Sequence, residues 1–494
     1  MTPIQEKEYL EEIYRVAQNG PYTPDWNSLF QFQVPQWYQK AKFGIFIHWG
    51  LYSLAAHANE WYSRNMYIKG REEWEYHRKT FGEHTKFGYK DFIPLFKAEK
   101  FNPKEWAKLF KDAGAQYVFP VAEHHDGYQM YRSKISKYNT WEMGPHRDIL
   151  GELKEATEAE EMVFCTSSHR AEHWWFMGHG KEFDSDVKEP MKRGDFYWPA
   201  MPEPHEADLQ SHPYPSQEFL EDWLLRTCEI IDQYQPSLLY FDWWIQHEAF
   251  REVFQVMTAY YYNRAAQWEK QVAVCYKHDA MMFGSGILEV ERGALAEAKP
   301  YCWQTDTAIA KNSWCYTDTL DYKTSRQIIQ TLIECICKNG NLLLNVGPKG
   351  DGSIPEKDQE ILHEIGAWLK KNGEAVYGCK PWRVDAEGPT KIREGQFTDN
   401  EELPYTKEDI RFVANGDSIY AFLMHFPEDG KVKIRSLAES KDQNSSAFHG
   451  LIREVKLLGF EEQKIQWSRD TEGLNLKVDG VQTALPVTVR IRMQ

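Results

Sequence analysis

The stretch Ser237-Leu238-Leu239-Tyr240-Phe241-Asp242-Trp243-Trp244 decides the fold. Its apolar run has the length and aromatic content of a strand buried on both faces, and a long amphipathic segment over 217–235 precedes it. This order predicts a parallel strand that follows a helix. Asp242 ends the strand among aromatic rings, where burying a carboxylate is costly unless it has a partner or a task. Asp242 is therefore a candidate nucleophile or, alternatively, the cap of a helix that starts near Glu248.

Strands and helices alternate on both sides of this stretch. Strands are predicted at residues 43–49, 116–122, 162–166, 237–244, 271–276 and 341–346, and helices at 106–113, 148–161, 217–235, 248–270, 325–338 and 355–371. Such alternation predicts a parallel sheet, which is either closed as a barrel or open and doubly wound.

Two observations favour the barrel. No Gly-x-Gly-x-x-Gly follows the first strand, so the dinucleotide fingerprint of an open sheet is missing. Polar residues recur where strands end: His48, His124 with His125, Ser167, Asp242 and the carboxylates that follow Ser285. In a (β/α)8 barrel these ends meet on one face, where active sites lie.

The pattern changes after Trp382. Helical periodicity gives way to short alternating runs between turns, and Asn415-Gly416-Asp417 and Asp429-Gly430 are hairpin signals. We therefore predict an α/β chain with a (β/α)8-like (TIM) barrel over residues 1–382 and an all-β sandwich over residues 383–494.

Composition narrows the class of protein. The chain has 494 residues, which is longer than a domain with one hydrophobic core usually is. Its net charge of -16 argues against nucleic acid or an anionic membrane as a partner. The 19 Trp and 27 Tyr suggest aromatic platforms for sugars. The sequence shows no signal peptide or membrane span, and its eight cysteines are scattered through apolar segments, so we expect reduced thiols and a cytoplasmic location.

A pair of carboxylates would suit one reaction in particular. Cleavage of a glycoside with retention of configuration needs two carboxyl groups about 5 Å apart, one attacking the anomeric carbon and one protonating the leaving oxygen. Asp242 supplies the first, and the acidic loop over 288–293 is the best source of the second. Glu289 and Glu291 both qualify, with an exposed acidic loop as the alternative reading.

The histidines near the predicted strand ends have two functional readings. Neutral imidazoles hydrogen-bond sugar hydroxyls, and neighbouring indoles pack on the apolar face of a sugar. The alternative is metal ligation by His48, His124, His125 and Asp242, as in a barrel metallohydrolase. Adjacent residues of an extended strand point to opposite sides, so His124 and His125 would both reach one metal only at a bend.

Several motifs carry a resemblance to a known family. They are Phe43-Gly44-Ile45-Phe46-Ile47-His48-Trp49-Gly50, Glu60-Trp61-Tyr62, His124-His125-Asp126-Gly127, Gly144-Pro145-His146-Arg147-Asp148, Trp303-Gln304-Thr305-Asp306-Thr307 and Asn339-Gly340-Asn341-Leu342-Leu343-Leu344-Asn345-Val346-Gly347-Pro348. Together, in order over about residues 36–382, they resemble the α-L-fucosidases of glycoside hydrolase family 29.

The resemblance implies an exo-acting retaining hydrolase that removes terminal α-L-fucose without a metal or other cofactor. Asp242 matches the nucleophile of the family, and Glu291, or alternatively Glu289, is the expected acid/base. The expected substrate-binding residues are His48, Glu60, Trp61, His124, His125, Tyr240 and Trp303.

Some residues depart from the family pattern. Tyr240 stands where tryptophan is usual, and Cys315 stands where glycine is usual. A common Tyr-Ser-x-x-Glu-Trp motif is replaced by Thr166-Ser167-Ser168-His169-Arg170-Ala171-Glu172-His173-Trp174-Trp175. These departures bear on sugar specificity, so an α-L-galactosidase-like activity and a non-catalytic fucose-binding protein remain the alternatives. The expected partner is a fucosylated oligosaccharide, and the sequence is compatible with a homo-oligomer.

Overall fold

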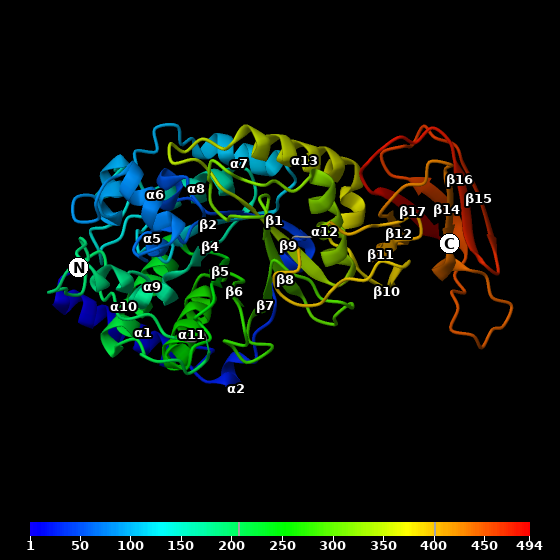
Figure 1. The fold of residues 1–494 in the computed structure, drawn as a ribbon. Helices are drawn as coiled ribbons and strands as arrows, with labels where there is room; N and C mark the ends of the chain where they lie inside the picture. The colour runs from blue at the N-terminus through cyan, green and yellow to red at the C-terminus, as the bar shows by residue number, and fades with distance from the viewer. Residues whose placement is uncertain (206–207, 400–401) are drawn as a thin grey trace.

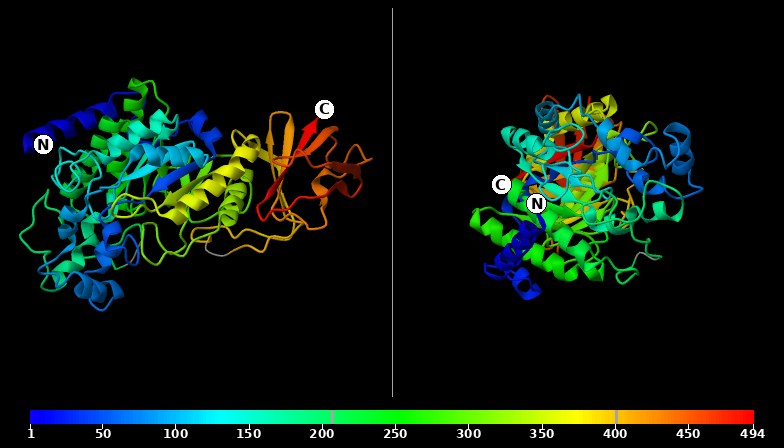
Figure 2. Two further views of the ribbon diagram at one scale, coloured as in Figure 1. Left: turned by 90° about the horizontal axis from the view of Figure 1, so that it is seen from above. Right: turned by 90° about the vertical axis from the view of Figure 1, so that its left-hand side faces the viewer.

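The computed structural model describes residues 1–205, 208–399 and 402–494. A barrel surrounded by helices makes up the N-terminal part, and the C-terminal strands form a separate lobe beside it (Figures 1 and 2). Among the described residues, no helix is long and apolar enough to cross a membrane.

Nine parallel strands form the barrel. They are β1 (Phe43–Ile47), β2 (Tyr117–Glu123), β3 (Val163–Phe164), β4 (Thr166–Ser168), β5 (Leu238–Phe241), β6 (Ala273–Tyr276), β7 (Ile287–Glu291), β8 (Trp303–Ala308) and β9 (Gly340–Val346). Both β3 and β4 pair with β2 and share one place in the barrel, interrupted at Cys165. Because β1 pairs with both β2 and β9, the sheet closes, which confirms the predicted barrel.

Six longer helices follow barrel strands along the chain. They are α7 (Pro103–Asp112), α8 (Ile149–Ala159), α10 (Gln217–Tyr234), α11 (Arg251–Gln267), α12 (Ser325–Cys337) and α13 (Glu356–Val376). Side chains cap several of their starts: Ser216 accepts from the Phe219 amide at α10, and Thr324 forms a capping box at α12. Helix α7 begins earlier than predicted because Asn102 caps it and Pro103 takes its first position.

The remaining helices are short, apart from the first. They are α1 (Pro3–Gln18), α2 (Trp26–Leu29), α3 (Gln36–Ala41), α4 (Tyr52–Ala55), α5 (Tyr62–Asn65), α6 (Glu72–Thr80), α9 (His173–Phe176), and the 3-10 helices η1 (Tyr89–Leu95), η2 (Arg170–Glu172), η3 (Gly178–Glu182), η4 (Glu248–Phe250) and η5 (Arg435–Leu437).

The acidic segment over 288–293, predicted as a loop, is mostly strand β7, and this corrects the sequence analysis. Its register pairs Glu289 with Gln304 and Glu291 with Asp306 of β8. Glutamate is depleted in strands, so the sequence pattern favoured a loop. The strand tolerates both carboxylates because Glu289 accepts a hydrogen bond from the Gln304 amide and Glu291 pairs with Lys277.

The loops that connect β7 to β6 and to β8 are irregular. Residues 277–286 and 292–302, all of them described, contain no helix. A segment from beyond the barrel packs there instead, because Ala294 forms an antiparallel bridge with Gly395. The amide of Phe397 also donates to the Glu291 carbonyl oxygen at 2.9 Å, so this segment reaches the end of β7.

The C-terminal lobe consists of two antiparallel sheets. One contains β10 (Lys380–Glu387), β11 (Ile410–Asn415), β12 (Ser418–Leu423), β17 (Val487–Met493) and β14 (Ile452–Leu457), and the other contains β13 (Lys431–Ile434), β16 (Gly473–Val478) and β15 (Ile465–Asp470). Side chains from both sheets, such as Phe412 and Leu476, share one apolar core, which confirms the predicted sandwich. The predicted boundary after residue 382 falls inside β10.

Candidate active site

A cavity of about 310 Å³ lies at the carboxyl ends of the barrel strands. It is lined by Phe46, His48, Glu60, Trp61, His124, His125, His169, Tyr240, Asp242, Trp243, Lys277, His278, Glu291, Asp306, Trp314 and Phe397. Eight of the ten predicted site residues are among them, whereas Glu289 and Trp303 are not.

Asp242 follows β5 and is held from three sides. One carboxylate oxygen accepts from Lys277 Nζ at 2.9 Å and from the Trp243 amide at 2.8 Å, and the other contacts His169 Nδ1 at 2.7 Å. Burial raises the pKa of Asp242, but Lys277 and His169 outweigh it and bring this pKa well below its usual value. Asp242 does not cap the following helix, since the His247 side chain caps η4. It is thus an ionised carboxylate in a cavity.

Glu291 ends β7 on the other side of Lys277, whose Nζ donates to its Oε2 at 2.6 Å. Burial raises the pKa of Glu291 to about 7 against the attraction of Lys277, with Asp242 and Asp306 adding to the rise. The two carboxyl groups therefore differ in protonation, and this separation of pKa values is what an acid and a nucleophile need.

Glu289 and Trp303 lie elsewhere, which corrects two predicted site residues. Glu289 is 1% exposed inside the barrel, where its Oε2 accepts from Gln304 Nε2 at 2.6 Å. Trp303 starts β8 and so lies at the opposite end of the barrel, fully buried, with Nε1 donating to the Lys338 carbonyl oxygen. Of the two candidate acids, the structure brings only Glu291 to Asp242.

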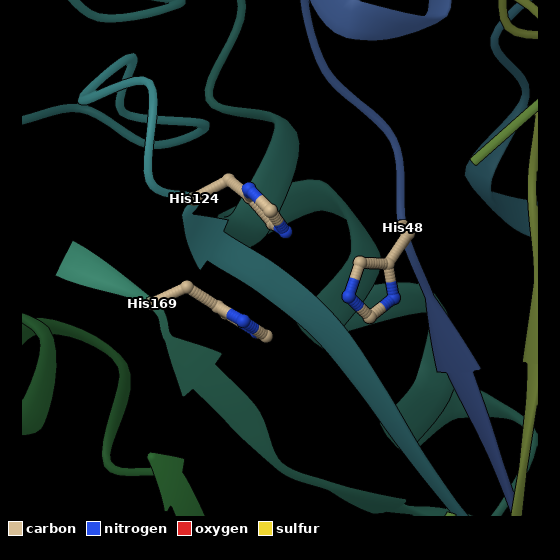
Figure 3. A group of neighbouring side chains, drawn as sticks. All are labelled: His48, His124 and His169. Carbon is tan, nitrogen blue, oxygen red and sulfur yellow. The ribbon is translucent and has the colours of Figure 1, made fainter. Parts of the chain in front are cut away.

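Three histidines converge on the cavity from neighbouring strands (Figure 3). Asn345 donates its amide to the Trp314 carbonyl, so its oxygen faces His48 Nδ1 at 2.7 Å and takes the proton of that nitrogen. His48 Nε2 is then an acceptor. Burial lowers the pKa of both His48 and His124 well below the usual value, and both imidazoles are neutral.

His125 and His169 surround Asp242. His125 donates from Nδ1 to the His169 carbonyl oxygen at 2.7 Å, and burial lowers its pKa to about 3. His169 faces Asp242 through Nδ1 at 2.7 Å, and because an ionised carboxylate can only accept, this nitrogen carries a proton. Its Nε2 contacts the Ser167 hydroxyl at 2.9 Å.

The imidazoles also have the donor atoms of a metal site. One nitrogen each of His48, His124 and His169 lie within 4.8 Å of one another, and a second such group joins His125, His169 and Asp242. His169, however, uses both nitrogens for protein contacts and His48 uses one, and a hydroxyl group of a sugar would suit the remaining nitrogen of His48 equally well. The prediction of no metal stays a prediction.

Glu60, Trp61 and Tyr240 complete the predicted set. Glu60 accepts from the Trp314 amide at 3.1 Å, and burial raises its pKa. Trp61 packs edge-on against Phe176 with ring centres 5.2 Å apart. The Tyr240 hydroxyl donates to Asp306 at 2.9 Å, so its ring, rather than its hydroxyl, is available to a ligand.

Sequence reasoning missed Lys277, His278, Asp306, Trp314 and Phe397 as lining residues, and named His169 only as a departure. Lys277 directly follows β6, so the rule that polar residues end barrel strands could have found it. Phe397 had no such signal because it comes from outside the barrel, from the segment that follows β10 of the C-terminal lobe.

Lys277 should control both ionisations of the pair. Replacing it with methionine removes the ammonium that lowers both carboxyl pKa values, so we expect the acid limb of kcat/KM to move up by roughly 1–3 pH units and the alkaline limb to move up as well. Lys277→Arg keeps the charge, so both limbs of its kcat/KM profile should lie at the same pH as in the wild type. A pH profile of the methionine variant that matches the wild type would contradict this role.

The comparisons with known proteins agree with this geometry. The family model Alpha-L-fucosidase matches residues 10–374, and the model Alpha-L-fucosidase C-terminal domain matches residues 402–490. The chain is 30% identical to tissue alpha-L-fucosidase of Rattus norvegicus over 94% of this chain and 88% of that protein. It is also 30% identical to tissue alpha-L-fucosidase of Homo sapiens, over 86% and 83%.

A solved structure is similar along most of the chain. The alpha-fucosidase of Thermotoga maritima is 28% identical, with a TM-score of 0.73 over 95% of this chain and all of that one. Its complex with fucose gives a TM-score of 0.72 at the same identity and coverage. The barrel, the C-terminal lobe, the carboxyl pair at the strand ends and these matches together show that the chain belongs to the α-L-fucosidase family.

Proposed function

We propose that this α-L-fucosidase is a retaining exo-hydrolase that releases terminal α-L-fucose through a covalent intermediate on Asp242. One observation carries the mechanism: Lys277 Nζ bonds both Asp242, at 2.9 Å, and Glu291, at 2.6 Å. The two bonded carboxylate oxygens are therefore at most about 5.5 Å apart, an upper limit that fits the close carboxyl groups of retaining enzymes better than the wider pair of inverting enzymes, which leaves room for a water.

The first step pairs a proton transfer with the attack. Glu291, whose pKa burial raises to about 7, gives its proton to the glycosidic oxygen from its protonated form. Asp242, ionised, forms a bond to the anomeric carbon as the bond to the leaving oxygen breaks. His169 keeps the nucleophile in place through its hydrogen bond at 2.7 Å.

The second step reverses the roles. Glu291, now a carboxylate, takes a proton from water, whose oxygen attacks the anomeric carbon and displaces Asp242. The product is α-L-fucose, and both carboxyl groups return to their starting states.

The shape of the cavity supports an exo-acting enzyme. Its volume of about 310 Å³ is at the small end of ligand sites, which favours one sugar ring over a chain. His48 and His124 line it while only 3% exposed, and their neutral imidazoles suit sugar hydroxyls.

Hydrolysis of 4-nitrophenyl α-L-fucopyranoside, with and without EDTA and beside the α-L-galacto analogue, tests the proposal. We expect release from the fucoside that EDTA does not change. Faster release from the galactoside would favour the α-L-galactosidase reading, and loss with EDTA would favour the metallohydrolase. Binding of fucose without release from either glycoside, by folded protein, would favour a non-catalytic fucose-binding protein.

A cytoplasmic site of action and small oligosaccharide substrates are part of the proposal. All eight cysteines lie in the described part of the chain as free thiols, and seven of them are buried. Reduced thiols are typical of the cytosol, which supports the location. Recovery of the native protein from a secretory compartment would contradict it.

A further inference from the structure

The segment that follows β10 of the C-terminal lobe crosses the end of β7, and residues 394–399 fix it there. Gly395 and Ala294 exchange backbone hydrogen bonds at 3.0 and 3.2 Å, and the Thr398 amide donates to the Arg292 carbonyl oxygen at 2.8 Å. A Cβ on Gly293 would lie 2.0 Å from the Gly395 oxygen, so the close approach depends on that glycine.

The segment is also tied to the barrel through side chains. Asp399 contacts the Lys323 ammonium and the Thr307 hydroxyl, Lys323 and Thr307 are buried, and the Asp399 side chain is only 7% exposed. The Glu394 carboxylate accepts from the Ala296 amide at 2.9 Å. These contacts hold the backbone on both sides of Phe397.

Phe397 itself is not a core residue. Its side chain is 60% exposed, while its amide donates to the Glu291 carbonyl oxygen at 2.9 Å. Its φ of 54° is uncommon for a bulky residue and strains the backbone. A small residue would fill this position at lower cost, so neither packing nor backbone preference explains the phenylalanine.

The place of the ring follows from the chemistry of its neighbour. An acid that protonates the glycosidic oxygen must stand beside the leaving group, so the leaving group lies on the Glu291 side of the cavity. Phe397 lines the same cavity and is bonded to Glu291 through its backbone. It is far more exposed than the deeper lining residues His48 and His124, at 3% each, so it lies at the rim.

We propose that Phe397 forms the leaving-group subsite, packing its ring on the apolar face of the pyranose or aryl group that departs. This inference rests on the proposed function, because it takes Glu291 as the acid. An aromatic ring that is exposed at the rim of a sugar pocket gives such a group a flat apolar contact. The C-terminal part of the chain thereby contributes to substrate choice in the barrel.

Two substrates separate this role from a general defect. Fucosyl fluoride has a leaving group too small to reach the rim, whereas a fucosyl disaccharide, chosen as the best substrate from a linkage panel, has a full pyranose there. For Phe397→Ala we expect kcat/KM to fall roughly three- to tenfold with the disaccharide and to stay unchanged with the fluoride. Phe397→Gly relaxes the backbone and should lose the same factor, because only the ring matters.

Two controls complete the design. Phe283→Ala removes another exposed ring, 48% exposed and outside the cavity lining, and should leave both substrates unaffected. The alkaline limb of kcat/KM near pH 7 should not move in Phe397→Ala, since that limb reports Glu291.

Each contrary result has its own meaning. An equal loss with both substrates, or a shifted alkaline limb, would overturn the proposal in favour of a role in positioning Glu291. An unchanged disaccharide rate would show that the ring does not touch the leaving group. Failure of the wild type to hydrolyse the fluoride would instead contradict the proposed function.

Discussion

Asp242→Gly should lower kcat for α-L-fucosides by a factor on the order of 10⁴ to 10⁶ while the protein stays folded. The variant lacks the oxygen that bonds to the anomeric carbon. It should still fold, because the buried Lys277 ammonium keeps its ion pair with Glu291. Steady-state kinetics give the loss, and a thermal melt confirms folding.

A matched pair of amides serves as the control. Asp242→Asn and Asp279→Asn make the same chemical change, but Asp279 is exposed and does not line the cavity. We expect only the first to abolish turnover.

Azide should partly restore turnover of 4-nitrophenyl fucoside by Asp242→Gly and give β-L-fucosyl azide, because azide attacks from the face that the carboxylate occupied. Turnover at the wild-type rate in the glycine variant would exclude Asp242 as the nucleophile.

Glu291→Gln should cost roughly 10²- to 10⁴-fold in kcat/KM with a fucosyl disaccharide and little with fucosyl fluoride. A sugar alkoxide needs a proton to depart, whereas fluoride does not. The wild-type kcat/KM with the disaccharide should also fall as the pH rises above about 7, where Glu291 loses its proton, and the variant should lack this limb. Asp242 sets the acid limb at much lower pH.

Glu289→Gln is the matched control for the acid. Burial raises the pKa of Glu289 well above its usual value, so the neutral amide mimics the protonated side chain. For Glu289→Gln we expect the ratio of kcat/KM with the disaccharide to kcat/KM with fucosyl fluoride to stay as in the wild type. If Glu289→Gln instead lost kcat/KM with the disaccharide but not with the fluoride, and Glu291→Gln did not, Glu289 rather than Glu291 would be the acid.

The barrel was predictable where strands are apolar throughout. All residues of β1, β2 and β5 are buried, and continuous apolar runs marked them in the sequence. Strand β7 was not predictable in this way, because Glu289 and Glu291 interrupt its apolar pattern. Their partners, Gln304 on β8 and Lys277 directly after β6, are distant in sequence and invisible to a local pattern.

The site was predictable where a polar residue directly follows a strand. His48, His124 and Asp242 fit this rule, and each lines the cavity. Glu289 and Glu291 are two residues apart on β7 and point to the same side of the strand. The choice between them required the residue at which β7 ends beside the cavity, which the sequence does not mark. Phe397 depended on a contact with β7 across about a hundred residues of sequence, which no local pattern can show.

Trapping the intermediate tests the central claim most directly. A 2-deoxy-2-fluoro-α-L-fucosyl fluoride slows both steps through its ring fluorine but keeps a good leaving group, so the covalent intermediate accumulates. Mass spectrometry of the intact and digested protein should show one fluorofucosyl group, on the peptide that carries Asp242, and none in Asp242→Asn. An adduct on another residue, or none in protein that hydrolyses the fucoside, would contradict the account.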